Sequence, residues 1–408
     1  MPDPSHSSPG GLTHRQAVAW RNGIFVVFAM CGIGIASWMA RTPAIKLELG
    51  ISVGQMGILI FGLAAGSILG LVFSSHLIAH FGARRIMMAC LVVAPLGLAV
   101  AGAGVTFGQV FAVVFLGLAL FGAGMGMCDV AMNLSGAVNE RVLGRTIMPV
   151  FHAFFSFGTM IGAGLGALAE LVHLPIAAQA VAIAVLMMAA GISGVRLTQS
   201  EHVIREAAGG ADDGKPDTWR ARLSIWRDPR TLLIGLIVLG MAFAEGSAND
   251  WLSLAAVEGH GVDKPTGAVV FGIFVTAMTI GRLAGVKVLD RYGRVPVLRA
   301  SAGLAAFGLL VFIFVPVLWI AIVGVVLWGL GAALGFPTGM SAAADDPRTA
   351  AARVSAVAMI GYCAFLVGPP LIGFLGEHFG LLHALLLVLV LIVVAGLASR
   401  AAREPGRA

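Results

Sequence analysis

Residues 108–140 read GQVFAVVFLGLALFGAGMGMCDVAMNLSGAVNE, an apolar run with one acid, Asp129, in its interior. A helix needs about 20 residues to cross the hydrocarbon of a bilayer, and this stretch is longer. A carboxylate in such a helix is costly and usually has a function. The stretch therefore predicts a membrane-spanning helix with a functional acid.

Eleven more apolar segments flank this one on both sides. Of the 408 residues 59% are hydrophobic and 11% are charged, whereas about 25% are charged in an average soluble protein. The runs are continuous and do not alternate, which excludes barrel strands. We predict an all-α membrane protein with twelve transmembrane helices, at residues 17–40, 54–79, 85–105, 108–138, 147–171, 175–196, 231–256, 266–289, 296–315, 317–340, 352–376 and 380–399.

Lys and Arg are concentrated in every second loop. With the N-terminus inside, the outer loops hold only Arg41, Lys46 and Lys264. Positive residues accumulate on the cytoplasmic side of membrane proteins, so we expect both termini in the cytoplasm. The formal net charge of +6 then reflects topology, and no nucleic-acid partner is expected.

The longest polar stretch divides the chain into six plus six segments. We predict a disordered cytoplasmic tail at 1–16, an N-terminal bundle at 17–196, a cytoplasmic linker at 197–230, a C-terminal bundle at 231–400 and a second tail at 401–408. The linker contains Gly-Gly and Pro, and residues 219–226 are expected to form an amphipathic helix on the membrane surface. All four cysteines lie in apolar segments and are expected to be buried.

The two halves have similar loops after their second segments, HFGARRIM at 80–87 and DRYGRVPVL at 290–298. Two parallel six-helix repeats with both termini inside are the layout of one transporter fold. On these residues the chain resembles a major facilitator superfamily transporter, whose loop motif is G-x-x-x-D-R-x-G-R-R. The second copy is more complete than the first, in which Ala79 and His80 replace the Asp and Arg. The matching residues are Gly82, Arg84, Arg85, Asp290, Arg291, Gly293 and Arg294.

The loop glycines permit a tight turn. The resemblance implies a cytoplasmic gate in which the charged residues hold helix ends together, while the alternative is that the arginines only set the topology.

The fifth and eleventh segments contain helix-packing and helix-bending residues. Gly158, Gly162 and Gly166 recur every four residues and share one helix face, which suits close packing. Gly368 precedes Pro369 and Pro370 inside an apolar run, where proline bends a helix. The antiporter family has its Gly-Pro pair in the fifth helix, so its position here disfavours a drug/proton antiporter.

Polar residues in the fourth and fifth segments form a candidate proton relay. Asp129 and Asn133 are one turn apart on the same face. His152 begins the next segment at a similar depth, so the three side chains are expected to meet. An acid and an imidazole that titrate near neutral pH can pass a proton. The alternative is a structural hydrogen-bonded pair that locks the two helices.

The seventh segment reads AFAEGSANDWLSLAA and contains two acids. Glu245 falls near the membrane midplane and is assigned to proton coupling. Asn249, Asp250 and Trp251 are assigned to substrate binding, because acids and amides bind hydroxyls and an indole stacks on a sugar. The alternative for Trp251 is an anchor at the membrane interface.

Within the superfamily, CDVAMN at 128–133 and RTIMPVFHAFFSFG at 145–158 resemble the fucose-permease-like branch, including little-characterised bacterial inner-membrane members. The resemblance implies that Asp129 couples protons and that Asn133 and His152 face the substrate. Fucose permeases use a second acid in the first helix, where this chain has none; Glu245 is expected to replace it.

These patterns predict a secondary transporter that moves a small polar or amphipathic solute, sugar-like by preference, by alternating access and proton symport. The alternatives are a proton-driven exporter and, more remotely, a membrane sensor. No phosphate loop or hydrolase motif occurs, so neither an enzyme nor ATP use is expected. We expect a monomer in the bacterial inner membrane, with the small-molecule substrate and membrane lipid as partners, the proton gradient as energy source, and no cofactor or metal.

Overall fold

The computed structural model describes residues 12–144, 147–199, 225–343, 345 and 350–404, and these residues form helices without strands. The elements are α1 (His14–Met39), α2 (Thr42–Leu49), α3 (Val53–Phe81), α4 (Ala83–Ala103), the π-helix η1 (Gly104–Gly108), α5 (Phe111–Leu143), α6 (Met148–Leu171), α7 (Ile176–Arg196), α10 (Pro229–His260), α11 (Lys264–Tyr292), α12 (Arg294–Phe314), α13 (Leu318–Ala332), α14 (Gly335–Ala343), α15 (Ala350–Phe379), α16 (Leu381–Ala384), α17 (Leu386–Ala398) and the 3-10 turn η2 (Ser399–Ala402).

The predicted all-α membrane architecture is confirmed. Within the described residues, 12 helical stretches are long and apolar enough to cross a membrane. Two predicted segments are divided: the tenth becomes α13 and α14, and the last is interrupted at Leu385. Helix α1 starts at His14, three residues before the predicted first segment at 17–40, because Thr13 and Gln16 form a capping box at its N-terminus. The surface helix expected at 219–226 lies mostly outside the described residues.

The chain separates into two compact units. The first contains residues 1–41, 47–49 and 62–213, and the second contains 42–46, 50–61 and 214–408. Residues 42–46 and 50–61, which fall inside the predicted N-terminal bundle at 17–196, are thus grouped with the second unit. Lys46 pairs with Glu258 at 2.7 Å, and the Gly54 N–H donates to Glu377 at 2.9 Å. Lys46 lies on α2 and Gly54 at the start of α3, and both bonds lie within the second unit.

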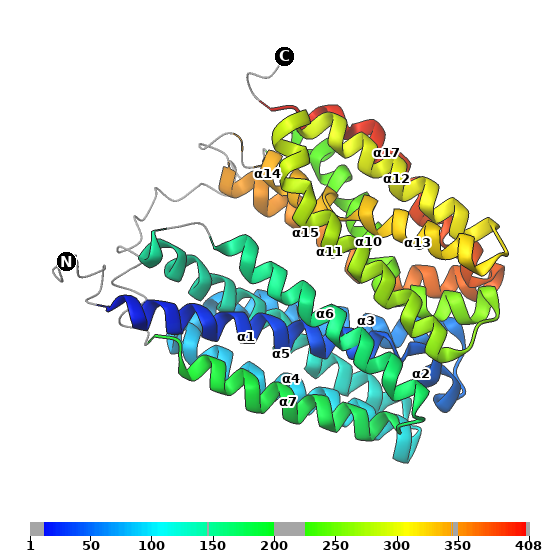
Figure 1. Ribbon diagram of the computed structural model, residues 1–408, viewed down its shortest axis with the longest axis horizontal. Helices are drawn as coiled ribbons and strands as arrows, with labels where there is room; N and C mark the ends of the chain where they lie inside the picture. Colours follow the sequence, from blue (N-terminus) through cyan, green and yellow to red (C-terminus); the bar gives the residue numbers. More distant parts are fainter. Residues whose placement is uncertain (1–11, 145–146, 200–224, 344, 346–349, 405–408) are drawn as a thin grey trace. The chain divides into compact units, whose positions relative to one another are not determined.

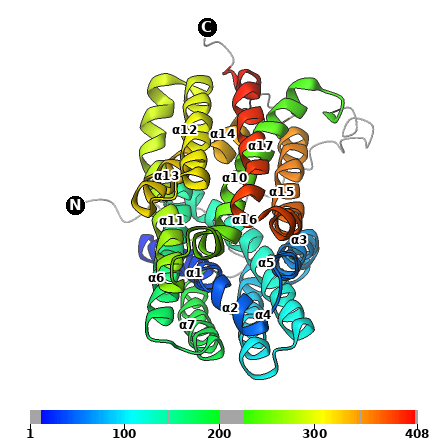
Figure 2. The same ribbon diagram turned by 90° about the vertical axis from the view of Figure 1, so that its right-hand side faces the viewer.

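Each unit repeats the same neighbour relations between its helices. In the first unit α1 packs on α6 and α7, and α4 packs on α5 and α7. In the second unit α10 packs on α15 and α17, and α12 packs on α13 and α17. Figure 1 shows α1 beside α6, and Figure 2 gives the turned view. Corresponding helices thus meet corresponding partners, as expected of two six-helix repeats.

The glycines of α6 lie against α1. A Cβ at Gly158 would overlap the carbonyl oxygen of Ala29, and one at Gly162 would lie 2.6 Å from that of Ile33. One turn further, a Cβ at Gly166 would lie 2.5 Å from the Cβ of Ala40. These backbones approach so closely that only glycine fits. In the second unit, α15 continues as a helix through Pro369 and Pro370, and Gly368 lies beside the Phe243 ring.

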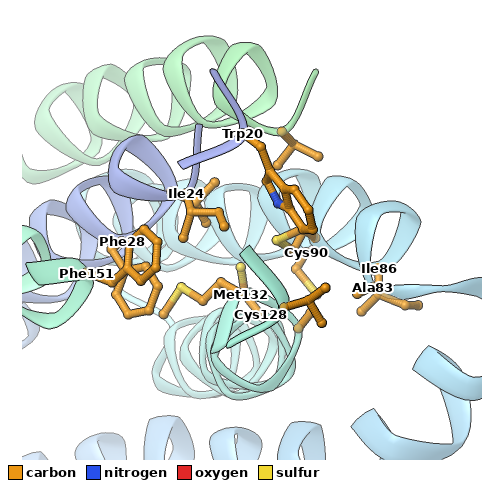
Figure 3. Close-up of a cluster of buried hydrophobic side chains, with 14 of the residues drawn as sticks. Trp20, Ile24, Phe28, Ala83, Ile86, Cys90, Cys128, Met132 and Phe151 are labelled. Atoms are coloured by element: carbon orange, nitrogen blue, oxygen red, sulfur yellow. The ribbon is translucent and has the colours of Figure 1, made fainter. Parts of the chain in front are cut away.

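The core of the first unit is shown in Figure 3, where Trp20 and Ile24 of α1 point toward Cys128 and Met132 of α5. The indole N–H of Trp20 donates to Ser135 Oγ at 2.9 Å. This N–H is the only hydrogen-bond donor of the Trp20 side chain, and it therefore has a partner inside the core. Three cysteines, Cys31, Cys90 and Cys128, are buried as predicted. The prediction is wrong for Cys363, which lies on an exposed side of α15.

The two loop glycines each form the whole connection between consecutive helices. Gly82 joins α3 to α4 with φ 86°, and Gly293 joins α11 to α12 with φ 78°. This part of conformational space is open to glycine and strained for other residues.

Candidate functional site

The acid of the first unit lies on α5 and is half-buried. The side-chain amide of Asn133 donates to Asp129 Oδ1 at 3.1 Å and to the Asp129 backbone oxygen at 2.8 Å. Both bonds run within one helix, because residues four apart lie on the same face. One carboxylate oxygen, Oδ2, has no hydrogen-bond partner among the described residues and can accept a proton or a solute hydroxyl.

His152 lies in the second turn of α6, and its ring is exposed. The ring packs edge-on against Phe28 of α1, with centroids 5.3 Å apart and an interplanar angle of 70°. A relay from Asp129 to His152 remains a prediction.

The acid of the second unit has a partner on the neighbouring helix. Arg282 Nη2 of α11 donates to both carboxylate oxygens of Glu245 on α10, at 2.8 and 2.9 Å. The Glu245 side chain is 17% exposed and that of Arg282 is 31% exposed. Glu245 is the seventeenth residue of a 32-residue helix, so the pair lies roughly half-way along the membrane span.

Arg282 occupies the inward face of α11. Three buried side chains lie on the same helix face, because Met278, Val275 and Phe271 precede Arg282 by four, seven and eleven residues. The exposed residue Ile280 lies on the opposite side of the helix. The guanidinium therefore points into the protein, as expected for a charge within a membrane span.

More polar groups follow Glu245 along α10. Asn249 and Asp250 are half-buried, and Asp250 has no hydrogen bond or ion pair with any described residue. Ser247 and Trp251 are buried, and neither Ser247 Oγ nor Trp251 Nε1 has a hydrogen-bond partner in the described part of the chain. Buried polar atoms without partners are rare and mark places for water or a polar ligand.

The indole of Trp251 is fully buried and reaches α15, where its Cη2 would lie 3.2 Å from a Cβ at Gly373. This burial excludes the alternative role as an anchor at the membrane interface, since such an anchor lies at the protein surface.

Charged residues also join helix ends at one end of the second unit. Asp345, just after α14, binds Arg294 Nη1 at 2.7 Å and Arg230 Nη2 at 2.9 Å. Arg294 also donates to Ser341 Oγ at 3.0 Å. The acid bound by the loop-motif arginine is thus Asp345, a residue that the sequence pattern does not single out. Of the other motif residues, Asp290, Arg291 and Arg85 are exposed.

A second pair at this end joins Arg353 of α15 to Asp228, the N-cap of α10, at 3.0 Å. Burial acts to raise the pKa of Asp228. Hydrogen bonds from Thr231 and from the Arg230 N–H, with the charge of Arg353, outweigh burial and hold the pKa below its usual value.

In the first unit, Arg84 Nη2 donates to the Arg196 carbonyl oxygen at 3.1 Å, which links the start of α4 to the end of α7.

A family model described as Major Facilitator Superfamily matches residues 23–365 and, in a second match, residues 251–408. The chain belongs to the Major Facilitator Superfamily. An uncharacterised superfamily transporter of Yersinia pestis is 29% identical over 394 residues, which cover 95% of this chain and 98% of that protein.

Solved structures of other superfamily members share the fold. A single-residue mutant of the nucleoside transporter NupG has a TM-score of 0.75 at 14% identity and covers 95% of this chain and 99% of its own. A variant of the Escherichia coli fucose:proton symporter FucP has a TM-score of 0.61 at 16% identity, with the same coverage. This chain is therefore a multi-pass superfamily transporter and not an enzyme.

Sequence reasoning located the acids of this superfamily member and the Asn133 partner of Asp129, but not the basic partners of Glu245 and Asp345. Arg282 interrupts an apolar segment, which was a usable signal, yet its pairing with Glu245 depends on how α10 and α11 pack. The sequence did not single out Asp345 as a functional acid, because an acid among other polar residues is not unusual. Among the described residues, no group of three or more His, Cys, Asp or Glu side chains is placed to hold a metal ion.

Proposed function

We propose that this transporter takes up a small polar solute, sugar-like by preference, together with protons by alternating access. We further propose that it belongs to the fucose-permease-like branch and works as a monomer in the bacterial inner membrane, with both termini in the cytoplasm. The distribution of Lys and Arg supports this orientation, and the proton gradient is the proposed energy source.

The observation that carries the proposal is the ion pair of Glu245 and Arg282 within the membrane span. A charge pair there is costly and is typical of substrate and proton pathways. Only Nη2 of Arg282 bonds to Glu245, and a guanidinium has five N–H donors in all. The remaining donors have no hydrogen-bond partner among the described residues, so they are available to hydroxyl or carboxylate oxygens of a solute.

The pair also supplies a route to coupling. When Glu245 binds a proton it loses its charge, and its attraction for Arg282 falls. The guanidinium then gains from bonding to an acceptor on the solute. Proton binding and solute binding therefore favour each other, as symport requires.

Polar atoms further along α10 complete the proposed binding surface in the second unit. Asp250 accepts hydroxyl protons, and Ser247 and Trp251 offer donors that no described residue uses. Hydroxyl-rich solutes satisfy such groups, while an apolar drug would leave them without partners. In the first unit Asp129, oriented by Asn133, is proposed as a second proton-binding group, together with His152 on α6.

The test is uptake by purified protein in vesicles with an imposed pH gradient, acidic outside. Labelled monosaccharides, sugar acids and amino acids that raise the melting temperature of the protein are used as solutes. We expect accumulation that collapses with a protonophore and is lost in Glu245→Gln, Arg282→Gln and Asp129→Asn. The matched control is Asp263→Asn, an acid at the start of α11, because Asn also caps helices.

Uptake that is unchanged in both Glu245→Gln and Asp129→Asn would overturn the coupling assignment. Expulsion of the solute driven by the same gradient would show the exporter alternative to be right.

A further inference from the structure

An open groove runs between α12 and the C-terminal elements α17 and η2, which pack side by side in the second unit (Figure 1). Its volume is about 520 Å³. Both walls consist of residues at helical spacing, so each presents one continuous face. The α12 wall is formed by Arg299, Ala302, Gly303 and Ala306.

The groove is positively charged at one end. Arg299 lies near the start of α12, and Arg400 follows the end of α17. Arg299 Nε donates to the neutral Ser399 Oγ at 3.1 Å. Neither guanidinium forms an ion pair with a carboxylate in the described part of the chain, and both residues are exposed. By the predicted orientation this is the cytoplasmic end of the bundle.

Below the arginines the groove is apolar and held open by small residues. A Cβ placed at Gly303 would have no neighbouring atom within 4 Å, and one at Gly396 would lie 3.0 Å from the Cβ of Ala302. From Arg299 to Ala306 the helix rises by about 10 Å. The apolar part therefore extends from the charged end toward the middle of the membrane.

We propose that this groove binds an anionic phospholipid of the cytoplasmic leaflet. Its phosphate lies between Arg299 and Arg400, and one acyl chain follows the floor at Gly303 and Gly396. Guanidinium groups bind phosphate oxygens through charge-assisted hydrogen bonds, and basic pockets between membrane helices on this side suit lipid headgroups. A free phosphate would satisfy the arginines but would leave the apolar floor unfilled.

The test is native mass spectrometry of the full-length protein in detergent, titrated with phosphatidylglycerol or phosphatidylcholine. We expect phosphatidylglycerol to bind more tightly. Arg299→Gln and Arg400→Gln should each weaken it about fivefold, and the double variant about 30-fold, since each basic group near anionic lipid contributes about 1 kcal/mol. The double Lys variant should retain most of the binding. Arg291→Gln, which changes an exposed arginine outside the groove, should have no effect.

A second pair of variants tests the acyl-chain part. Gly303→Leu fills the floor without a backbone clash and should weaken phosphatidylglycerol binding. Gly164→Leu is the matched control, because Gly164 is an exposed α6 glycine that also has open space around it.

Equal binding of the two lipids, or unchanged binding in the double Gln variant, would overturn the proposal. So would full competition by millimolar inorganic phosphate, because it would show a simple anion site. None of these measurements depends on transport, so they are independent of the proposed substrate and coupling.

Discussion

The ion pair between Arg41 and Glu170 allows a quantitative test of packing in the first unit. Arg41 Nε lies 2.5 Å from Glu170 Oε1, and the two side chains are only 6% and 7% exposed. Arg41 also donates to Gln179 Oε1 at 2.5 Å and to the Leu174 carbonyl at 3.0 Å. One guanidinium therefore joins the C-terminal ends of α1 and α6 to the first turn of α7.

Replacing Arg41 with Gln leaves the Glu170 carboxylate buried without a counter-charge. Breaking a buried pair in this way costs about 3–5 kcal/mol, and we expect a loss of unfolding free energy in that range. The double variant Arg41→Met/Glu170→Leu removes both charges, and such replacements are often neutral or stabilising. It should therefore be more stable than Arg41→Gln by at least about 2 kcal/mol.

Buried thiols provide the assay. In a Cys363→Ser background, the remaining cysteines, Cys31, Cys90 and Cys128, are all buried in the first unit. Labelling by a thiol-reactive dye during denaturation then reports the opening of that unit. The control is Arg21→Gln in the same unit, because the Arg21 side-chain bonds to Asn22 are exposed and their loss should change the unfolding free energy by no more than about 0.5 kcal/mol.

The reasoning would be refuted if Arg41→Gln unfolded at the wild-type midpoint. It would also fail if the double variant were less stable than Arg41→Gln.

Three further predictions concern helix ends. Gly293→Ala should destabilise the protein by about 1–3 kcal/mol, because its φ of 78° is strained for alanine; Gly303→Ala, with open space around it, is the thermal-melting control. Asp263 caps α11 by accepting from Thr266, whose hydrogen bonds hold the pKa of Asp263 below its usual value. The pKa of Asp263 is thus lower in the folded than in the unfolded protein. The stabilisation that the Asp263 carboxylate provides is therefore complete above the unfolded-state pKa and is lost as the pH falls through the folded-state pKa. Asp263→Ala should cost about 1 kcal/mol near neutral pH and progressively less as the pH falls through the folded pKa of Asp263, as acid titration of both proteins would reveal. Asp345→Asn weakens the bonds to Arg294 and to a second arginine and should lower the melting temperature of the protein. An unchanged melting temperature would contradict a role for Asp345 in holding these helix ends.

The candidate site was only partly visible in the sequence. Asp129, Glu245 and Asp250 stand out because each is a charge in an apolar run, and this is a local property. The Asp129–Asn133 contact follows from helical spacing alone. The burial of Trp251 was not predictable, because an indole near the end of an apolar segment can lie in the core or at the interface.

The sequence by itself determined the twelve spans, their order and the two repeats, because the length of an apolar run and the spacing of glycines are properties of short stretches. The neighbour relations of the helices confirm the repeats. Only the tertiary structure decided which charges neutralise each other: Glu245 with Arg282, Glu170 with Arg41, and Asp345 with two arginines. It also assigned residues 42–46 and 50–61 to the second unit. These partners are distant in sequence or lie on different helices, so their meeting depends on how the helices pack.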